Sequence, residues 1–161
     1  MTNDLDDLFA RLRVATAPAE IESLQQGIWQ RWLTTGDQSL DKDLERGIRA
    51  LGAEDYSRAI AVFTALIEAR PDFAEGWNKR ATAYYLRGEY RASLLDVQET
   101  LRHEPRHFGA LSGWAMMLRA LGDLRGSMRV LRRLGRLCPY WPGLQEQLRT
   151  LRDHLDQEGE G

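Results

Sequence analysis

Two histidines, His103 and His107, have the spacing most typical of a metal-binding pair. Side chains four residues apart lie on one face of a helix and could together hold a zinc ion. Pro105 stands between them, however, and a proline there ends the helix that this spacing requires. The sequence also offers no cysteine or carboxylate cluster, no glycine-rich phosphate loop and no activated nucleophile. We therefore expect a protein that is not an enzyme and that uses no catalytic residue, metal or cofactor.

The single cysteine, Cys138, has no second cysteine with which to form a disulfide within the chain. It directly precedes Pro139, at the expected end of a helix. A thiol in such a place is usually buried and unreactive. We expect the same of Cys138.

A row of arginines is the strongest charged feature of the sequence. Its members recur at helical spacing, at Arg125, Arg129, Arg132, Arg133 and Arg136. Each like-charged pair four residues apart costs about 0.2–0.5 kcal/mol, which favours an anionic neighbour. Either the row serves an acidic or phosphate-bearing partner, or it is simply solvated or neutralised by the chain's own acidic C-terminal residues. We favour the second, and these residues are Glu146, Asp153, Asp156, Glu158 and Glu160.

The elements that position these side chains are indicated by three equally spaced prolines, Pro71, Pro105 and Pro139. Sliding the sequence by the interval between them aligns residues of similar class: Trp77 with Leu111, Ala81 with Ala115, Tyr84 with Leu118, Gly88 with Gly122, Tyr90 with Leu124, Ser93 with Ser127 and Val97 with Leu131. The interval is therefore a repeat period. Each copy reads as a helix, a glycine stop, a second helix and a proline. Such a pair cannot bury both of its apolar faces alone, so the period predicts an all-α solenoid of stacked pairs.

The aligned residues resemble the tetratricopeptide repeat pattern, in three copies over roughly residues 40–139. The LDxLFAxL start and the DFAEGWNKRAT segment are also similar to small alphaproteobacterial tetratricopeptide proteins. The resemblance implies a right-handed α-solenoid with a concave groove for peptides or protein surfaces, and it implies no reaction. One domain is expected over 1–161. Its parts are a degenerate helix pair at 1–36, repeats at 40–73, 74–107 and 108–141, a capping helix at 142–156 and a frayed tail at 157–161.

Two features of the N-terminal pair carry further expectations. Asn3 and Asp4 are expected to cap its first helix. Its second helix contains Trp29 and Trp32, which could form an exposed patch for a partner. We expect them to be core residues instead, because bulky aromatic side chains at helical spacing are usually buried.

In tetratricopeptide units the first helix of each pair lines the groove with the face opposite its packing stripe. The resemblance therefore implies the groove residues Glu45, Ile48, Asn78, Lys79, Thr82, Tyr85, Ser112, Met116 and Arg119. The family's clamp for a chaperone C-terminal carboxylate needs several cationic residues across three first helices. It is absent here, because the flanking repeats offer Asp41, Leu44, Gly109 and Gly113.

We expect a non-enzymatic adaptor that binds a protein or peptide partner in this groove. The alternative is a self-associating structural module, a possible homo-oligomer, because residues 1–56 hold 6 basic and 11 acidic groups whereas residues 106–139 hold 7 and 1. Nucleic acid is not expected as a partner, since the net charge is −2. Membrane insertion is not expected either, because no apolar run approaches about 18 residues. The acidic start favours a cytoplasmic protein, or a periplasmic one if a signal peptide has been removed.

Overall fold

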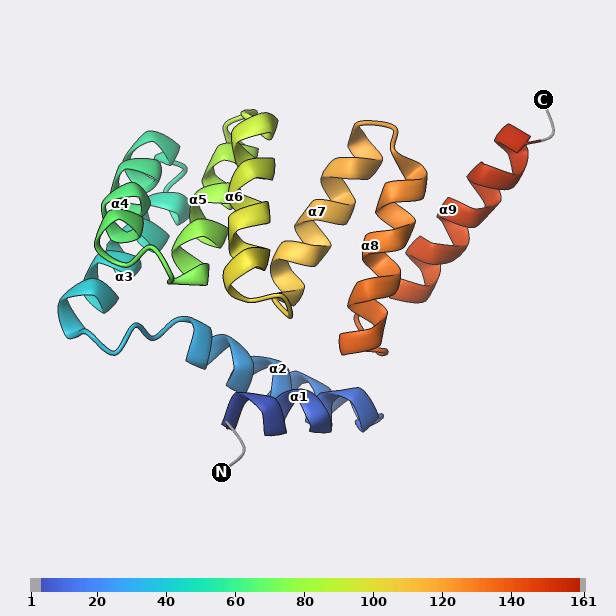
Figure 1. Ribbon diagram of the computed structural model, residues 1–161, viewed down its shortest axis with the longest axis horizontal. Coiled ribbons are helices and arrows are strands. Elements are labelled where there is room, and N and C mark those ends of the chain that lie inside the picture. The colour runs from blue at the N-terminus through green and yellow to red at the C-terminus, as the bar shows by residue number, and fades with distance from the viewer. Residues whose placement is uncertain (1–3, 160–161) are drawn as a thin grey trace. The chain divides into compact units, whose positions relative to one another are not determined.

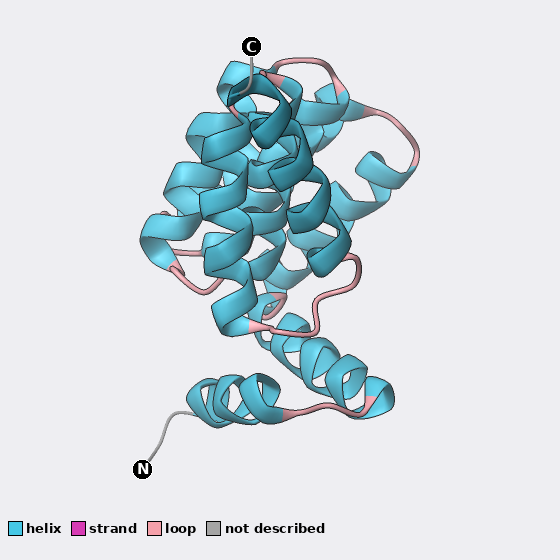
Figure 2. Cartoon of the chain, turned by 90° about the vertical axis from the view of Figure 1, so that its right-hand side faces the viewer, coloured by secondary structure: helices cyan, strands magenta, loops and turns pink. Residues whose placement is uncertain are grey.

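The computed structural model describes residues 4–159, and these residues form nine α-helices joined by short connections (Figure 1). The helices are α1 (Asp4–Val14), α2 (Pro18–Trp32), α3 (Gln38–Gly52), α4 (Tyr56–Ala69), α5 (Ala74–Leu86), α6 (Tyr90–His103), α7 (Phe108–Ala120), α8 (Leu124–Leu137) and α9 (Leu144–Gly159). Over this described range the chain has no strand, and Figure 2 shows only helices and loops. The all-α prediction is confirmed. Of the described helices, none is both long and apolar enough to span a membrane.

The described chain divides into two compact units. The central unit runs from Trp29 to Ala110 and contains the end of α2, the whole of α3 to α6 and the start of α7. The terminal unit contains the described residues up to Ile28 and those from Leu111 onward, and so includes α1, α8 and α9. The single domain expected over 1–161 stays a prediction.

The repeat period is visible in the way the second helices of the three pairs end. α4, α6 and α8 each end two residues before one of the three prolines. Their C-cap residues have nearly the same backbone angles: φ −139°, ψ 78° at Arg70, φ −134°, ψ 93° at Glu104 and φ −138°, ψ 85° at Cys138. A residue before proline is restricted to extended conformations, so the proline spacing itself stops these helices.

The turn within each helix pair needs a backbone conformation that favours glycine. Gly88 and Gly122 have φ of 84° and 83° in the second and third pairs. Glu54 occupies the equivalent place in the first pair, one repeat period before Gly88, with φ of 60°. This conformation costs a residue with a side chain roughly 1–2 kcal/mol. The first repeat therefore keeps the turn geometry although it lacks the glycine.

Small residues allow the two helices of a pair to approach closely, and serine hydroxyl groups join them. Ser93 on α6 donates to the carbonyl of Ala81 on α5 at 2.8 Å. Ser127 on α8 makes the same bond to Ala115 on α7, also at 2.8 Å. All four side chains are buried. The matched serines and alanines in the sequence thus correspond to one repeated contact.

An arginine joins successive repeats of the central unit. The guanidinium of Arg80 on α5 donates to both carboxylate oxygens of Asp96 on α6 at 2.8 Å, and to the hydroxyl of Thr64 on α4 at 3.0 Å. Asp96 is buried, and its hydrogen bonds raise the pKa of Arg80 above the ordinary arginine value. This ion pair holds α5 and α6 against α4 and sets the position of the face that α5 presents.

The first helix of the terminal unit contacts the last repeat. The buried apolar face of α1 consists of Leu8, Phe9 and Leu12. α1 contacts α8, the second helix of the last repeat. The apolar face of α1 is therefore buried within the unit that contains the last repeat. The degenerate helix pair expected at 1–36 stays a prediction.

The capping helix is present but longer than predicted. α9 contacts α8 and lies beside it (Figure 1), with Leu144 and Leu151 buried. It continues to Gly159 rather than ending at 156, because residues 156–158 are compatible with a helix. The last two residues of the expected frayed tail, 160 and 161, lie outside the described residues, as does the expected cap Asn3.

Cys138 is buried, as expected. The side-chain amide of Gln25 donates to its Sγ at 3.4 Å, within the terminal unit. Burial raises the pKa of the Cys138 thiol, which keeps it protonated and unreactive.

Candidate functional site

The exposed face of the first helices in the central unit carries four of the predicted groove residues. Glu45 and Thr82 are exposed, on α3 and α5 respectively. Ile48 is half-buried against the hydrophobic core of the unit, and the half-buried ring of Tyr85 lies 5.4 Å from that of Tyr90. These side chains combine hydroxyl, carboxylate and apolar groups, which can hydrogen-bond a peptide and contact its side chains.

Asn78, also predicted to line the groove, is buried instead, so its expected position in an open groove is wrong. Its side-chain amide donates to Glu75 one turn earlier on α5, at 3.3 and 3.4 Å. Lys79, whose side chain is 23% exposed, forms an ion pair with the same carboxylate at 3.3 Å. The Glu75 side chain is fully buried. A buried carboxylate must be paired, and it draws both of these predicted groove residues into its own hydrogen bonds.

His107 provides a further partner of Glu75. Its Nε2 lies 2.7 Å from the Glu75 carboxylate, and its Nδ1 accepts a hydrogen bond from the backbone amide of Ala110 at 3.1 Å. Because Nδ1 accepts, the ring hydrogen is assigned to Nε2, which donates to Glu75. His107 thereby caps the first turn of α7 and joins it to α5. His103, at the end of α6, instead stacks on Trp77, so the two histidines have separate partners.

Trp29 and Trp32, at the end of α2, cover this polar cluster. The ring of Trp32 stacks on His107 at 4.2 Å with an angle of 11°, and Trp32 is 7% exposed. Trp29 is half-buried, with the Lys79 ammonium 5.6 Å from its ring centre. Both indoles also contact the ring of Phe108, at 5.3 and 4.8 Å. The expectation that both are core residues is confirmed for Trp32 and holds in part for Trp29.

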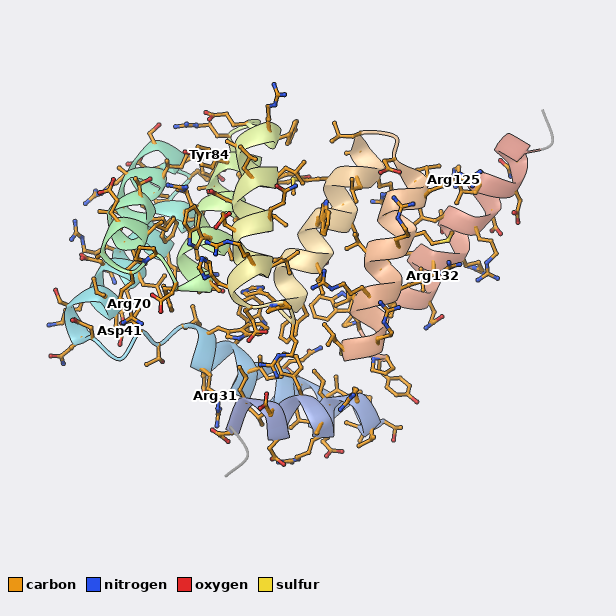
Figure 3. The ribbon with its side chains drawn as sticks, in the orientation of Figure 1. Arg31, Asp41, Arg70, Tyr84, Arg125 and Arg132 are labelled. Atoms are coloured by element: carbon orange, nitrogen blue, oxygen red, sulfur yellow. The ribbon has the colours of Figure 1, made fainter. Side chains whose placement is uncertain are left out.

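The connection after α2 is held by hydrogen bonds to α3 and to the end of α4. The amide and hydroxyl of Thr35 both donate to Asp41, each at 2.7 Å, and the Arg70 guanidinium donates to the Thr35 carbonyl at 3.2 Å. Figure 3 shows Asp41 and Arg70 close together at this connection. The hydrogen bonds from Thr35 lower the pKa of Asp41 below its ordinary value. Beside them, Arg70, Trp32 and Glu75 are among the residues that line a hollow of about 180 Å³.

Three residues at or near this segment share one place in the repeat. Asp41, Glu75 and Gly109 follow one another at the repeat period, in the first turns of α3, α5 and α7. A Cβ at Gly109 would lie 2.8 Å from the Trp29 ring, so glycine is needed there. We call residues 29–35 the crossing segment, because it runs across all three first helices of the central unit. Sequence reasoning missed this site, although the periodic spacing of these three residues was a signal that could have indicated it.

The remaining predicted groove residues belong to the terminal unit. Ser112 is half-buried there, whereas Met116 and Arg119 are exposed on α7. Their exposure is compatible with partner contact within that unit.

The arginine row divides into two groups on α8. Arg129, Arg133 and Arg136 line a hollow of about 310 Å³ with the half-buried Trp114 and Leu118. Arg125 and Arg132 do not line it (Figure 3).

The acidic residues of α9 do not neutralise the arginine row as expected. Glu146 pairs with Arg149 on its own helix at 2.5 Å. Among the described side chains, no ion pair joins Asp153 or Asp156 to the row. The remaining members of the expected tail, Glu158 and Glu160, lie outside the described side chains.

Comparisons with known proteins agree with this architecture. Residues 44–98 match the family described as tetratricopeptide repeat. A TPR repeat-containing protein of Rhizobium etli is 32% identical over 151 residues, which cover 94% of this chain and 74% of that protein. The Sgt2 TPR domain from Aspergillus fumigatus matches with a TM-score of 0.67 and 19% identity, over 78% of this chain and 84% of that one. The first TPR domain of Spaghetti (RPAP3), bound to an HSP90 peptide, matches with a TM-score of 0.65 and 21% identity, over 70% and 89%. These similarities confirm the solenoid of helix pairs.

Proposed function

This chain belongs to the tetratricopeptide repeat family, and from that premise we propose that it is a non-enzymatic adaptor that binds a peptide or protein segment on the first-helix faces. The observation that carries the proposal is the exposed face of α3 and α5, where Glu45, Ile48, Thr82 and Tyr85 offer polar and apolar groups on a rigid support. In the terminal unit Ser112, Met116 and Arg119 would contribute from α7.

The partner differs in chemistry from a chaperone tail. A structural neighbour holds an HSP90 peptide, which supports a peptide as the class of ligand. The carboxylate clamp that such a tail requires has no donors at the flanking positions of this chain, where Leu44 and Gly113 stand. A segment with hydroxyl, backbone and apolar groups therefore fits this face better than a C-terminal carboxylate.

A peptide library selected on the full chain tests the proposal. Thr82→Arg places a bulky cation on the exposed face of α5 and is expected to weaken the selected peptides at least tenfold. Gln98→Arg, the matched control, makes the same kind of change on the exposed side of α6 and is expected to leave binding unchanged. Equal loss of binding in both variants, or the absence of any selected peptide, would contradict the proposal.

Self-association by oppositely charged solenoid ends is the second candidate. The uneven charge supports it, because residues 1–56 hold 6 basic and 11 acidic groups whereas residues 106–139 hold 7 and 1. Light scattering at low and high salt distinguishes the candidates: a larger species at low salt only supports self-association, and a monomer at both argues against it.

A further inference from the structure

The crossing segment occupies its surface in the way a bound ligand would. It reaches three first helices: the Thr35 amide and hydroxyl donate hydrogen bonds to Asp41 on α3, and the Trp29 ring lies against Lys79 on α5 and Gly109 on α7. Its contacts are of the mixed kind that binding sites use, namely aromatic stacking at one end and hydrogen bonds to the backbone at the other. A surface with such contacts can recognise any chain that offers the same groups.

The groups that the segment offers follow a simple pattern. Trp29, Trp32 and Thr35 are three residues apart, and each makes a separate contact. Trp29 lies on Gly109, Trp32 stacks on His107, and the Thr35 amide and hydroxyl bind Asp41. The Arg70 guanidinium binds the backbone carbonyl at Thr35, and so requires no particular side chain at this place. A matching partner thus needs two aromatic side chains three residues apart and a Ser or Thr three residues later.

The same segment covers part of the face assigned to the partner. The Lys79 ammonium lies 5.6 Å from the centre of the Trp29 ring. A partner that used the whole face of α5 would have to displace this indole. Two ligands for one surface exclude each other, so occupation by the segment lowers the apparent affinity of any outside ligand.

We propose that this surface of the central unit binds a partner segment of the form aromatic-x-x-aromatic-x-x-Ser/Thr, and that residues 29–35 are its built-in competitor. This inference rests on the proposed function, because it names the chemistry of the partner and the regulation of the same face. Displacement of the crossing segment uncovers the Lys79 ammonium for the partner. The segment is attached to the surface by the chain itself, so its effective concentration is in the millimolar range.

A peptide with the sequence of residues 26–38 of this chain, labelled with fluorescein, is the probe. It is titrated by fluorescence anisotropy against the full wild-type chain and against the full chain with Trp29→Ala and Trp32→Ala. The double variant is expected to bind the probe at least tenfold more tightly, because its own segment no longer competes. Gln30→Ala, on the exposed side of α2, is the matched control and is expected to behave like the wild type.

Two results would overturn the inference. One is equal affinity of the probe for the wild type and the double variant, and the other is no binding to a double variant whose circular dichroism remains helical. If that variant loses its helical signal, Thr35→Ala replaces it. Loss of the hydroxyl bond to Asp41 is then expected to tighten probe binding about threefold to tenfold, and unchanged binding by Thr35→Ala overturns the inference.

The library peptides separate this inference from the proposed function. A peptide that the probe displaces and that gains affinity in the double variant supports the inference. A different outcome is a peptide whose binding is lost in Thr82→Arg, but which the probe does not displace and which binds the double variant as it binds the wild type. Such a peptide overturns the inference and still supports the adaptor function. Binding of the probe to the double variant without any library peptide supports the surface and contradicts the adaptor function.

Discussion

Replacement of Glu75 tests whether its buried carboxylate holds α5, α7 and the end of α2 together. The side chain is fully buried and is bonded by His107 at 2.7 Å, by Asn78 at 3.3 Å and by Lys79 at 3.3 Å. Glu75→Gln keeps the shape but removes the charge, and its amide nitrogen faces at least one of these donors. Hydrogen bonds to a charged group contribute about 1.5–3 kcal/mol each, so we expect a loss of about 2–4 kcal/mol in the free energy of unfolding. Glu75→Ala also leaves a buried ring N–H unpaired and is expected to cost about 3–5 kcal/mol.

Urea unfolding followed by circular dichroism and by tryptophan fluorescence measures these losses. Glu99→Gln is the matched control, since it makes the same chemical change in the same unit. The Glu99 side chain is 36% exposed and pairs with Arg102 on the surface of α6, so its replacement is expected to cost less than about 1 kcal/mol. A Glu75→Gln variant within about 0.5 kcal/mol of that control, on the order of the scatter among surface substitutions, would refute the reasoning. It would mean that the desolvation of the carboxylate already cancels its hydrogen bonds.

Three other predictions concern the backbone and the crossing segment. Gly109→Ala forces a Cβ against an indole and is expected to destabilise the chain by about 1–2 kcal/mol in urea unfolding, whereas Gly113→Ala, with open space around its Cβ on the same helix, is expected to stabilise it by about 0.5–1 kcal/mol. Equal changes in the free energy of unfolding for Gly109→Ala and Gly113→Ala would contradict the contact between Gly109 and the Trp29 ring. Glu54→Gly removes the cost of a positive φ at a residue with a side chain. It is expected to increase the free energy of unfolding by about 1 kcal/mol, which a higher melting temperature would show. The hydrogen bonds from Thr35 lower the pKa of Asp41 in the folded chain. Their contribution to the free energy of unfolding is therefore complete above the ordinary carboxyl pKa of 3.8, and it is lost as the pH falls through the lower pKa of the folded state. Hydrogen exchange at the Thr35 amide should therefore lose protection below about pH 4, and full protection retained at about pH 2 would contradict this.

Most of the helical architecture could be predicted from the sequence because it depends on local rules. A proline at the same place in every repeat stops each second helix through the restriction on the preceding residue, and Gly88 and Gly122 permit the turns within their pairs. The serines at 93 and 127 face alanines twelve residues earlier because both repeats fold in the same way. The exposure of Thr82 also follows from helical periodicity alone.

The candidate site could be predicted only in part. The resemblance implied which side of α5 lines a groove, but the sequence could not say what covers that side. Asn78 and Lys79 lie on the predicted face and are nevertheless engaged with Glu75 and the indoles. The sequence also could not say that Glu146 pairs with Arg149 on its own helix, since a local partner one turn away competes with the arginine row for its carboxylate.

The sequence by itself determined the repeats, because each repeat is specified by residues within one period. The tertiary structure alone decided that residues 29–35 cross three of those repeats and bury a charged cluster. The contact between Trp32 and His107 joins residues far apart in the chain, and no multiple of the period relates them. It forms because a buried carboxylate at Glu75 requires donors, and the indoles that exclude water from it come from outside the repeat pattern.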